Sequence, residues 1–203
     1  CDRLLSGVPE LPKPDRGTEA EIYYLKSKAL FYVDDLEGAQ FLVRRAIQKS
    51  GEIAVYRAFE GQLGFELGRF DEAKKHLERA VAMDPESAHA VYHLGLVLER
   101  LGRDDDARRA FQQANALDTD HYPLPVVVDD AAFERITAEA LADLPRSIRE
   151  YVEHMPVLVR DFPDAELLAN ENVSPQILGI FIGVPRTEAA STAQARDIDR
   201  VIL

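Results

Sequence analysis

Residues 88–118 read AHAVYHLGLVLERLGRDDDARRAFQQANALD, and this stretch decides the fold. Its first part carries apolar residues at a helical period, and a second helical pattern follows Gly102 and an acidic triplet. The same small and apolar residues recur at a spacing of 34: Ala39, Ala73 and Ala107; Ala46, Ala80 and Ala114; Gly61 and Gly95; Gly68 and Gly102; Leu77 and Phe111. A fixed period of about 34, with small residues where helices meet, predicts stacked helical hairpins.

Three repeat units follow from this period, at roughly 20–53, 54–87 and 88–121. Each unit is expected to form a helix, a turn and a second helix. The first unit is the most diverged, because Ser27 stands where the later units have glycine and Asp34 replaces the turn glycine. The middle unit ends at Asp84 and Pro85, which stop a helix.

These units resemble the tetratricopeptide repeat family over about residues 20–121. The matching residues are Val91, Tyr92, His93, Leu94, Gly95, Gly102, Ala107, Phe111 and Ala114 in the last unit, and Gly61, Gly68, Phe70, Ala73, Leu77, Ala80 and Pro85 in the middle one. Thr119 departs from the proline usual in the family. The resemblance implies a right-handed α-α superhelix, with a concave face lined by the first helix of each hairpin.

That concave face would be the partner-binding groove. On this register it presents Tyr24, Lys28, Tyr32, Gln62, Glu66, His89, Tyr92 and Arg100. We therefore expect a protein or peptide partner in the groove, with the alternative that the tyrosines simply pack between helices. Members that bind chaperones hold a terminal carboxylate with Lys and Asn, where this chain has residues such as Tyr24, Ala58 and Leu96, so that role is not expected.

A different pattern begins after residues 121–125, where prolines break the helical period. One helix is expected from Asp129 or Asp130 to before Pro145, and a second over about 146–154. Short β-branched runs follow at 156–160, 177–185 and 199–203. Two helices followed by strands predict a small α+β segment. The expected domains are an N-terminal tether at 1–19, three hairpins at 20–122 and this segment at 123–203.

The segment resembles the front part of the minimal zincin-type metallopeptidase family over about residues 129–203. The resemblance is carried by Phe133, Leu144-Pro145, Val157-Leu158-Val159, Asp161-Phe162-Pro163, 178–185 and 199–203. In that family a later helix carries His-Glu-x-x-His, which binds zinc and activates water. These 203 residues contain no such motif, so no catalytic or zinc-binding residue is assigned. Two hypotheses stay open: an interaction scaffold without a cofactor, or a zinc peptidase whose motif lies beyond residue 203.

His89 and His93 lie one helical turn apart, a spacing that can bind a metal. They lack a neighbouring glutamate and a third ligand in sequence, and the repeat register already accounts for them. We therefore expect ordinary interhelix histidines and assign no metal ligand. The acidic triplet Asp104–Asp106 lacks the glycine and further oxygen ligands of a calcium loop, so a solvated turn is expected there.

The formal net charge of −12 argues against binding to nucleic acid or to an anionic membrane surface, because phosphate would be repelled. The single cysteine, Cys1, excludes an internal disulfide. Cys1 is either the acylated end of a bacterial lipoprotein, with residues 2–17 as a tether, or the start of a cytoplasmic fragment. The apolar runs 180–182 and 201–203 are expected to leave an uncovered sheet face, which predicts self-association through residues 178–203.

Overall fold

A computed structural model describes residues 15–152, 157–158, 162–163, 174–177, 180–182 and 200–202. The chain divides into two compact units, 1–123 and 124–203, and each is described by itself. Cys1, the candidate lipidation site, lies outside the described residues, as does most of the 178–203 segment expected to self-associate.

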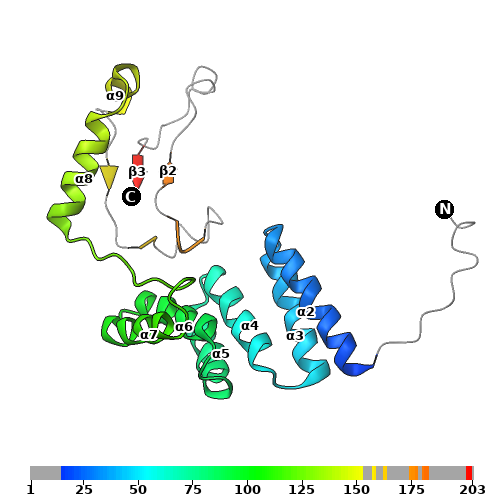
Figure 1. Ribbon diagram of the computed structural model, residues 1–203. Helices are drawn as coiled ribbons and strands as arrows, with labels where there is room; N and C mark the ends of the chain where they lie inside the picture. Colours follow the sequence, from blue (N-terminus) through cyan, green and yellow to red (C-terminus); the bar gives the residue numbers. More distant parts are fainter. Residues whose placement is uncertain are drawn as a thin grey trace, which may run out of the picture. The chain divides into compact units, whose positions relative to one another are not determined.

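Three helical hairpins make up the first unit (Figure 1). Their helices are α2 (Arg16–Tyr32) and α3 (Leu36–Ser50), α4 (Ala54–Glu66) and α5 (Phe70–Met83), and α6 (Ala88–Arg100) and α7 (Asp104–Leu117). Successive helices pack against each other, and α4 also packs against α6. The first helices of the second and third hairpins therefore lie side by side, which is the arrangement that the repeat period predicts.

The start of α2 lies inside the stretch assigned to the tether. Asp15 is the N-cap, and its side chain accepts a hydrogen bond of 2.9 Å from the backbone N–H of Thr18. A carboxylate at this position satisfies a backbone donor that would otherwise lack a helical partner. The helix consequently begins at Arg16, before the boundary at residue 20 that the repeat period suggested.

The turns within the hairpins confirm the repeat register. Asp34, Gly68 and Gly102 have φ angles of 63°, 69° and 68°, and each ends the first helix of its hairpin. This left-handed conformation favours glycine, and aspartate is one of the few other residues that tolerate it. Asp34 therefore does occupy the place of the turn glycine in the first hairpin.

The six alanines of the period lie in the core of the first unit. Ala39, Ala46, Ala73, Ala80 and Ala114 are fully buried, and Ala107 is nearly so. Glycines on the facing helices are equally constrained, since a Cβ on Gly64 would lie 3.2 Å from the Cβ of Ala73. The prediction that these small residues mark close helix contacts is confirmed.

The second unit begins with α8 (Asp130–Ala142), capped by Asp129, and α9 (Arg146–Val152). Three short strands follow: β1 (Val157–Leu158), β2 (Ile180–Ile182) and β3 (Arg200–Ile202). They form a sheet in the order β1-β3-β2, with β1 and β3 parallel and β2 and β3 antiparallel. The strands lie within the three β-branched runs, but such short elements do not identify a metallopeptidase fold. The chain as a whole is mainly helical.

Candidate partner-binding face

Side chains of α2 contact α4, and a side chain of α4 contacts α6. The Tyr24 ring of α2 packs 4.8 Å from the ring of Tyr56 and 5.6 Å from that of Phe59, both on α4. Gln62 of α4 and His89 of α6 are joined by a contact of 3.2 Å between Oε1 and Nε2. We use the name α2/α4/α6 face for the groove that the repeat register predicts, whose predicted residues are Tyr24, Lys28, Tyr32, Gln62, Glu66, His89, Tyr92 and Arg100.

Lys28 and His89 interact electrostatically, although they come from the first and third hairpins. The Lys28 ammonium lies 5.8 Å from the centre of the Tyr24 ring. Burial lowers the pKa of His89, and the positive charge of Lys28 lowers it further. His89 is therefore a neutral imidazole at pH 7, able to donate to the Gln62 carbonyl oxygen and accept from a bound group.

The three tyrosines of the face have different environments. Tyr32 is 78% exposed at the end of α2. Tyr24 is half-buried, and burial raises its pKa. Tyr92 packs 5.4 Å from the Phe111 ring and 5.0 Å from the Tyr122 ring. Tyr92 thus belongs to the helix packing, whereas Tyr32 offers most of its ring to solvent.

Glu66 and Arg100 are the last residues of α4 and α6. The Arg100 side chain is 10% exposed, and its guanidinium lies 5.9 Å from the centre of the Phe65 ring and 3.3 Å from the Glu99 carboxylate. Burial lowers the pKa of Arg100, partly offset by the charge of Glu99. Glu66 is half-buried. The charged group of Arg100 is thus largely buried within the first unit.

The rings of His89 and His93 are in contact, with centres 4.2 Å apart and planes tilted by 34°. His93 is 8% exposed, its Nδ1 donates to the His89 carbonyl oxygen at 2.9 Å, and burial lowers its pKa to about 4. Across the part of the chain that the structure describes, no group of three or more His, Cys, Asp or Glu is placed to hold a metal ion.

Two further residues, on α4 and α6, were not predicted from the sequence. Val55 of α4 is exposed, and it occupies the repeat position that His89 has in α6. Glu99 is half-buried beside Arg100, and burial raises the pKa of its carboxyl group. The 34-residue period would have found Val55. The pKa of Glu99 depends on packing, which the period does not report.

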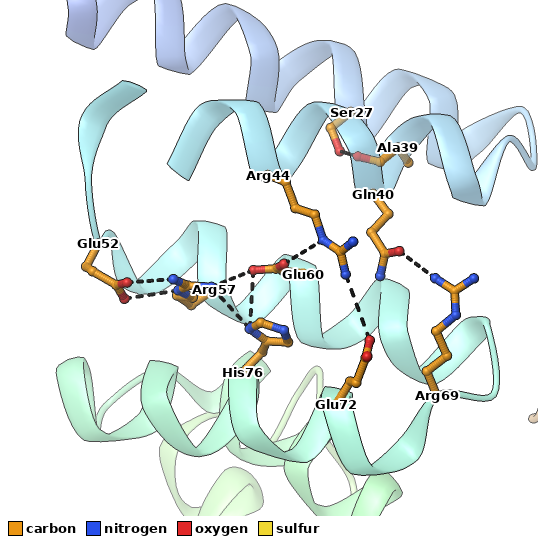
Figure 2. Close-up of polar contacts among 10 residues, drawn as sticks. All are labelled: Ser27, Ala39, Gln40, Arg44, Glu52, Arg57, Glu60, Arg69, Glu72 and His76. Carbon is orange, nitrogen blue, oxygen red and sulfur yellow. Dashed lines mark hydrogen bonds and ion pairs between the residues drawn. The ribbon is translucent and has the colours of Figure 1, made fainter. Parts of the chain in front are cut away.

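A buried carboxylate joins the first two hairpins on a different set of helices (Figure 2). Glu60 of α4 is 3% exposed, and it accepts from Arg44 Nε at 3.0 Å and Arg57 Nη1 at 2.8 Å. His76 Nδ1 lies 3.2 Å from the same carboxylate. Arg57 also binds Glu52, and Arg44 reaches Glu72 at 3.9 Å. This cluster ties α3, α4 and α5 together.

The chemistry of the Glu60 cluster is structural. Its carboxylate is already bound by two guanidinium groups, which hold it between the helices. Burial lowers the pKa of His76. The negative charge of Glu60 raises this pKa, and the positive charges of Arg57 and Arg44 lower it. Gln40 adds a second link between hairpins through a 2.6 Å bond from Arg69 Nη1.

Residues 60–121 match the family model described as tetratricopeptide repeat. No curated protein matches the chain. Among solved structures, the Arabidopsis OM64 TPR domain is 23% identical, covers 51% of this chain and 86% of its own, and superposes with a TM-score of 0.50. The first TPR of Spaghetti (RPAP3), bound to HSP90 peptide SRMEEVD, is 16% identical. The match covers 65% of this chain and 100% of that structure, with a TM-score of 0.50.

These similarities concern the helical repeats. Neither the family match nor the two structures extends to a metallopeptidase, so the zincin resemblance of residues 129–203 has no support from them. Of the helices that the structure describes, none combines the length and apolar character needed to cross a bilayer. The helical hairpins of this chain form a superhelix of the tetratricopeptide repeat type.

Proposed function

We propose that this protein is an interaction scaffold that binds a protein or peptide segment on the α2/α4/α6 face. The observation that carries the proposal is the convergence of Lys28, Gln62 and His89, one from each of three consecutive hairpins. A peptide lying across these residues would contact all three hairpins at once. Side chains from one hairpin alone would offer a much smaller surface.

The chemistry of the face fits an extended peptide. Lys28 supplies a positive charge, while Gln62 and His89 supply donors and acceptors for backbone amides. Tyr32 and Val55 add exposed aromatic and apolar area at its edges. Tyrosine is enriched in interfaces because it combines a large apolar ring with a hydroxyl group. The repeat fold supports this class of function, since repeat arrays present extended binding surfaces.

Peptide selection tests the proposal. A random peptide library displayed on phage would be selected against the chain, and the affinity of the recovered peptides measured by fluorescence anisotropy. We expect Lys28→Glu to weaken binding by about tenfold or more, as for a central interface residue. Lys75→Glu is the matched control, because it makes the same charge change at an exposed position on α5. Equal binding by the two variants would contradict the proposal.

The peptidase hypothesis stays a proposal that rests on sequence resemblance alone. It would require zinc as a cofactor and a His-Glu-x-x-His motif outside these residues. Lipidation at Cys1 is likewise a proposal, with membrane anchoring as its consequence. Elemental analysis and intact mass of the protein purified from its native source test both: bound zinc supports the first, and the added mass of acyl chains supports the second.

A further inference from the structure

The first and third hairpins that the structure describes have different outer surfaces. On α2, Ile22 is 39% exposed and Leu25 is 56% exposed, and Ala29 is also exposed. The residues at the same repeat positions are buried in the later hairpins: Tyr56, Phe59 and Leu63 on α4, and Ala90, His93 and Val97 on α6. In α4 these residues pack against the hairpin that precedes it. The α2 stripe thus has the character of a surface that another helix covers.

The third hairpin has polar residues at the positions where the second hairpin has apolar ones. Phe65, Phe70 and Val81 of the second hairpin pack against the third. The third hairpin has Glu99, Asp104 and Asn115 at the same repeat positions. Asn115 Nδ2 donates to the Tyr122 carbonyl oxygen at 3.0 Å, and the Tyr122 ring covers Tyr92. Polar side chains at these positions are typical of the last repeat of an array.

This difference disfavours head-to-tail stacking of copies. The α2 stripe would then meet the polar end formed by Glu99, Asp104 and Asn115, and apolar side chains would desolvate charged groups. A two-fold pairing avoids the mismatch, because it places the same surface of both copies together. The α2 stripe has the spacing for such a pairing: Ile22, Leu25, Ala29 and Tyr32 follow one another by three, four and three residues, as in a helix-pairing seam.

The charges beside the stripe fix the direction of the pairing. Glu19 and Glu21 lie in the first half of α2, and Lys26 and Lys28 lie in the second. Glu21 and Lys26 are exposed, whereas Glu19 already pairs with Lys49 at 2.8 Å. Antiparallel helices place the acidic half of one against the basic half of the other.

We propose that two copies of this chain associate through α2, antiparallel and overlapping along the whole helix. This register sets Ile22 beside Leu25 of the partner subunit. It also brings Glu21 next to Lys28 of the partner subunit, and the two-fold axis repeats both contacts. Flanking charges of opposite sign set orientation in paired helices. The pairing covers Ile22 and Leu25, the part of the exposed apolar stripe nearest the two-fold axis.

Lys28 and Tyr32 also belong to the α2/α4/α6 face, so the pairing is tested by sedimentation equilibrium of the full chain without any peptide, where peptide binding plays no part. We expect a monomer–dimer equilibrium at micromolar to submillimolar concentration. Leu25→Glu should weaken the dimer by about tenfold or more, since it buries an unpaired charge at the interface centre. Phe41→Glu on α3 is the matched control, because Phe41 is 59% exposed, close to the 56% of Leu25. A monomer throughout, or equal effects of the two variants, would overturn the proposal.

A charge exchange tests the antiparallel register. Glu21→Lys alone and Lys28→Glu alone should each weaken the dimer, because like charges then face each other across the interface. The double variant should recover the affinity of the unaltered chain. In a parallel pair the new Lys at position 21 would instead face Lys26 of the partner subunit and stay repulsive. A double variant no tighter than the single variants would therefore exclude the proposed pairing.

Discussion

Gly95 on α6 lies directly against the ring of Phe111 on α7. A Cβ built on Gly95 would be 2.7 Å from Cε1 of that ring, well inside van der Waals contact. Phe111 is almost fully buried and belongs to the core cluster, so its ring has little room to move. The glycine therefore sets how closely the two helices of the third hairpin approach each other.

Gly95→Ala tests this close contact through the sign of its effect. In an open helix, replacing glycine with alanine stabilises by about 1 kcal/mol. Here we expect the free energy of unfolding to fall by about 1–3 kcal/mol, because the added methyl overpacks the contact. Urea unfolding followed by circular dichroism measures the change. Gln112→Ala, exposed on α7, is the control and should have little effect. A stabilised Gly95→Ala variant would show that the contact is loose.

Glu60→Ala should destabilise the junction between the first and second hairpins. It removes the buried partner of Arg44, Arg57 and His76, and leaves the largely buried Arg57 with fewer acceptors. We expect the free energy of unfolding to fall by about 2–4 kcal/mol. This is less than the largest cost of breaking a buried ion pair, because Arg44 is half-exposed.

Glu78→Ala is the matched control for Glu60→Ala. Glu78 pairs with Lys74 at 3.5 Å on α5, and its side chain is exposed. Exposed pairs of this kind contribute less than about 1 kcal/mol. Thermal unfolding of both variants gives the comparison. Equal losses would mean that burial of the Glu60 cluster adds nothing to stability.

Stability should fall as the pH is lowered from about 6.5 toward 4, partly through His93. Burial lowers the pKa of His93 to about 4 in the folded state, whereas an unfolded histidine keeps a value near 6.5. The unfolded state then binds more protons in this window, which favours unfolding by at most about 3 kcal/mol. Above pH 6.5 both states are neutral and the effect vanishes.

His93→Leu removes this titration while keeping an apolar side chain, as Phe59 does at the same repeat position. Unfolding free energies measured between pH 4 and 7 should depend less on pH in the variant. Part of the dependence should remain, because burial also lowers the pKa of His76 and His89. An unchanged slope would show that His93 is protonated as readily in the folded state as in the unfolded one.

The sequence predicted the helical repeats well because their constraint is local and periodic. Ala73 and Ala107 must be small where helices touch, and the turn between helices needs a left-handed residue. Those requirements recur every 34 residues, so the period located the hairpins and even the substitution of Asp34 for glycine.

The remaining features depend on contacts that have no period. Glu60, Arg44 and His76 come from three helices, and nothing in their spacing marks them as neighbours. Asp15 caps α2 through a single side-chain bond, so the helix begins earlier than the repeat does. Tyr24, Tyr32 and Tyr92 share a repeat-based assignment, yet their burial differs because each meets different neighbours.

The central claim is that a partner binds the α2/α4/α6 face. Two-dimensional NMR of the Gln62 side-chain amide and the His89 imidazole, during titration with a selected peptide, tests it most directly. Both signals should shift together with the same affinity, because the two side chains are joined at 3.2 Å and would contact one ligand. Shifts confined to α3, α5 and α7, with Gln62 and His89 unchanged, would place the binding site elsewhere and contradict the account.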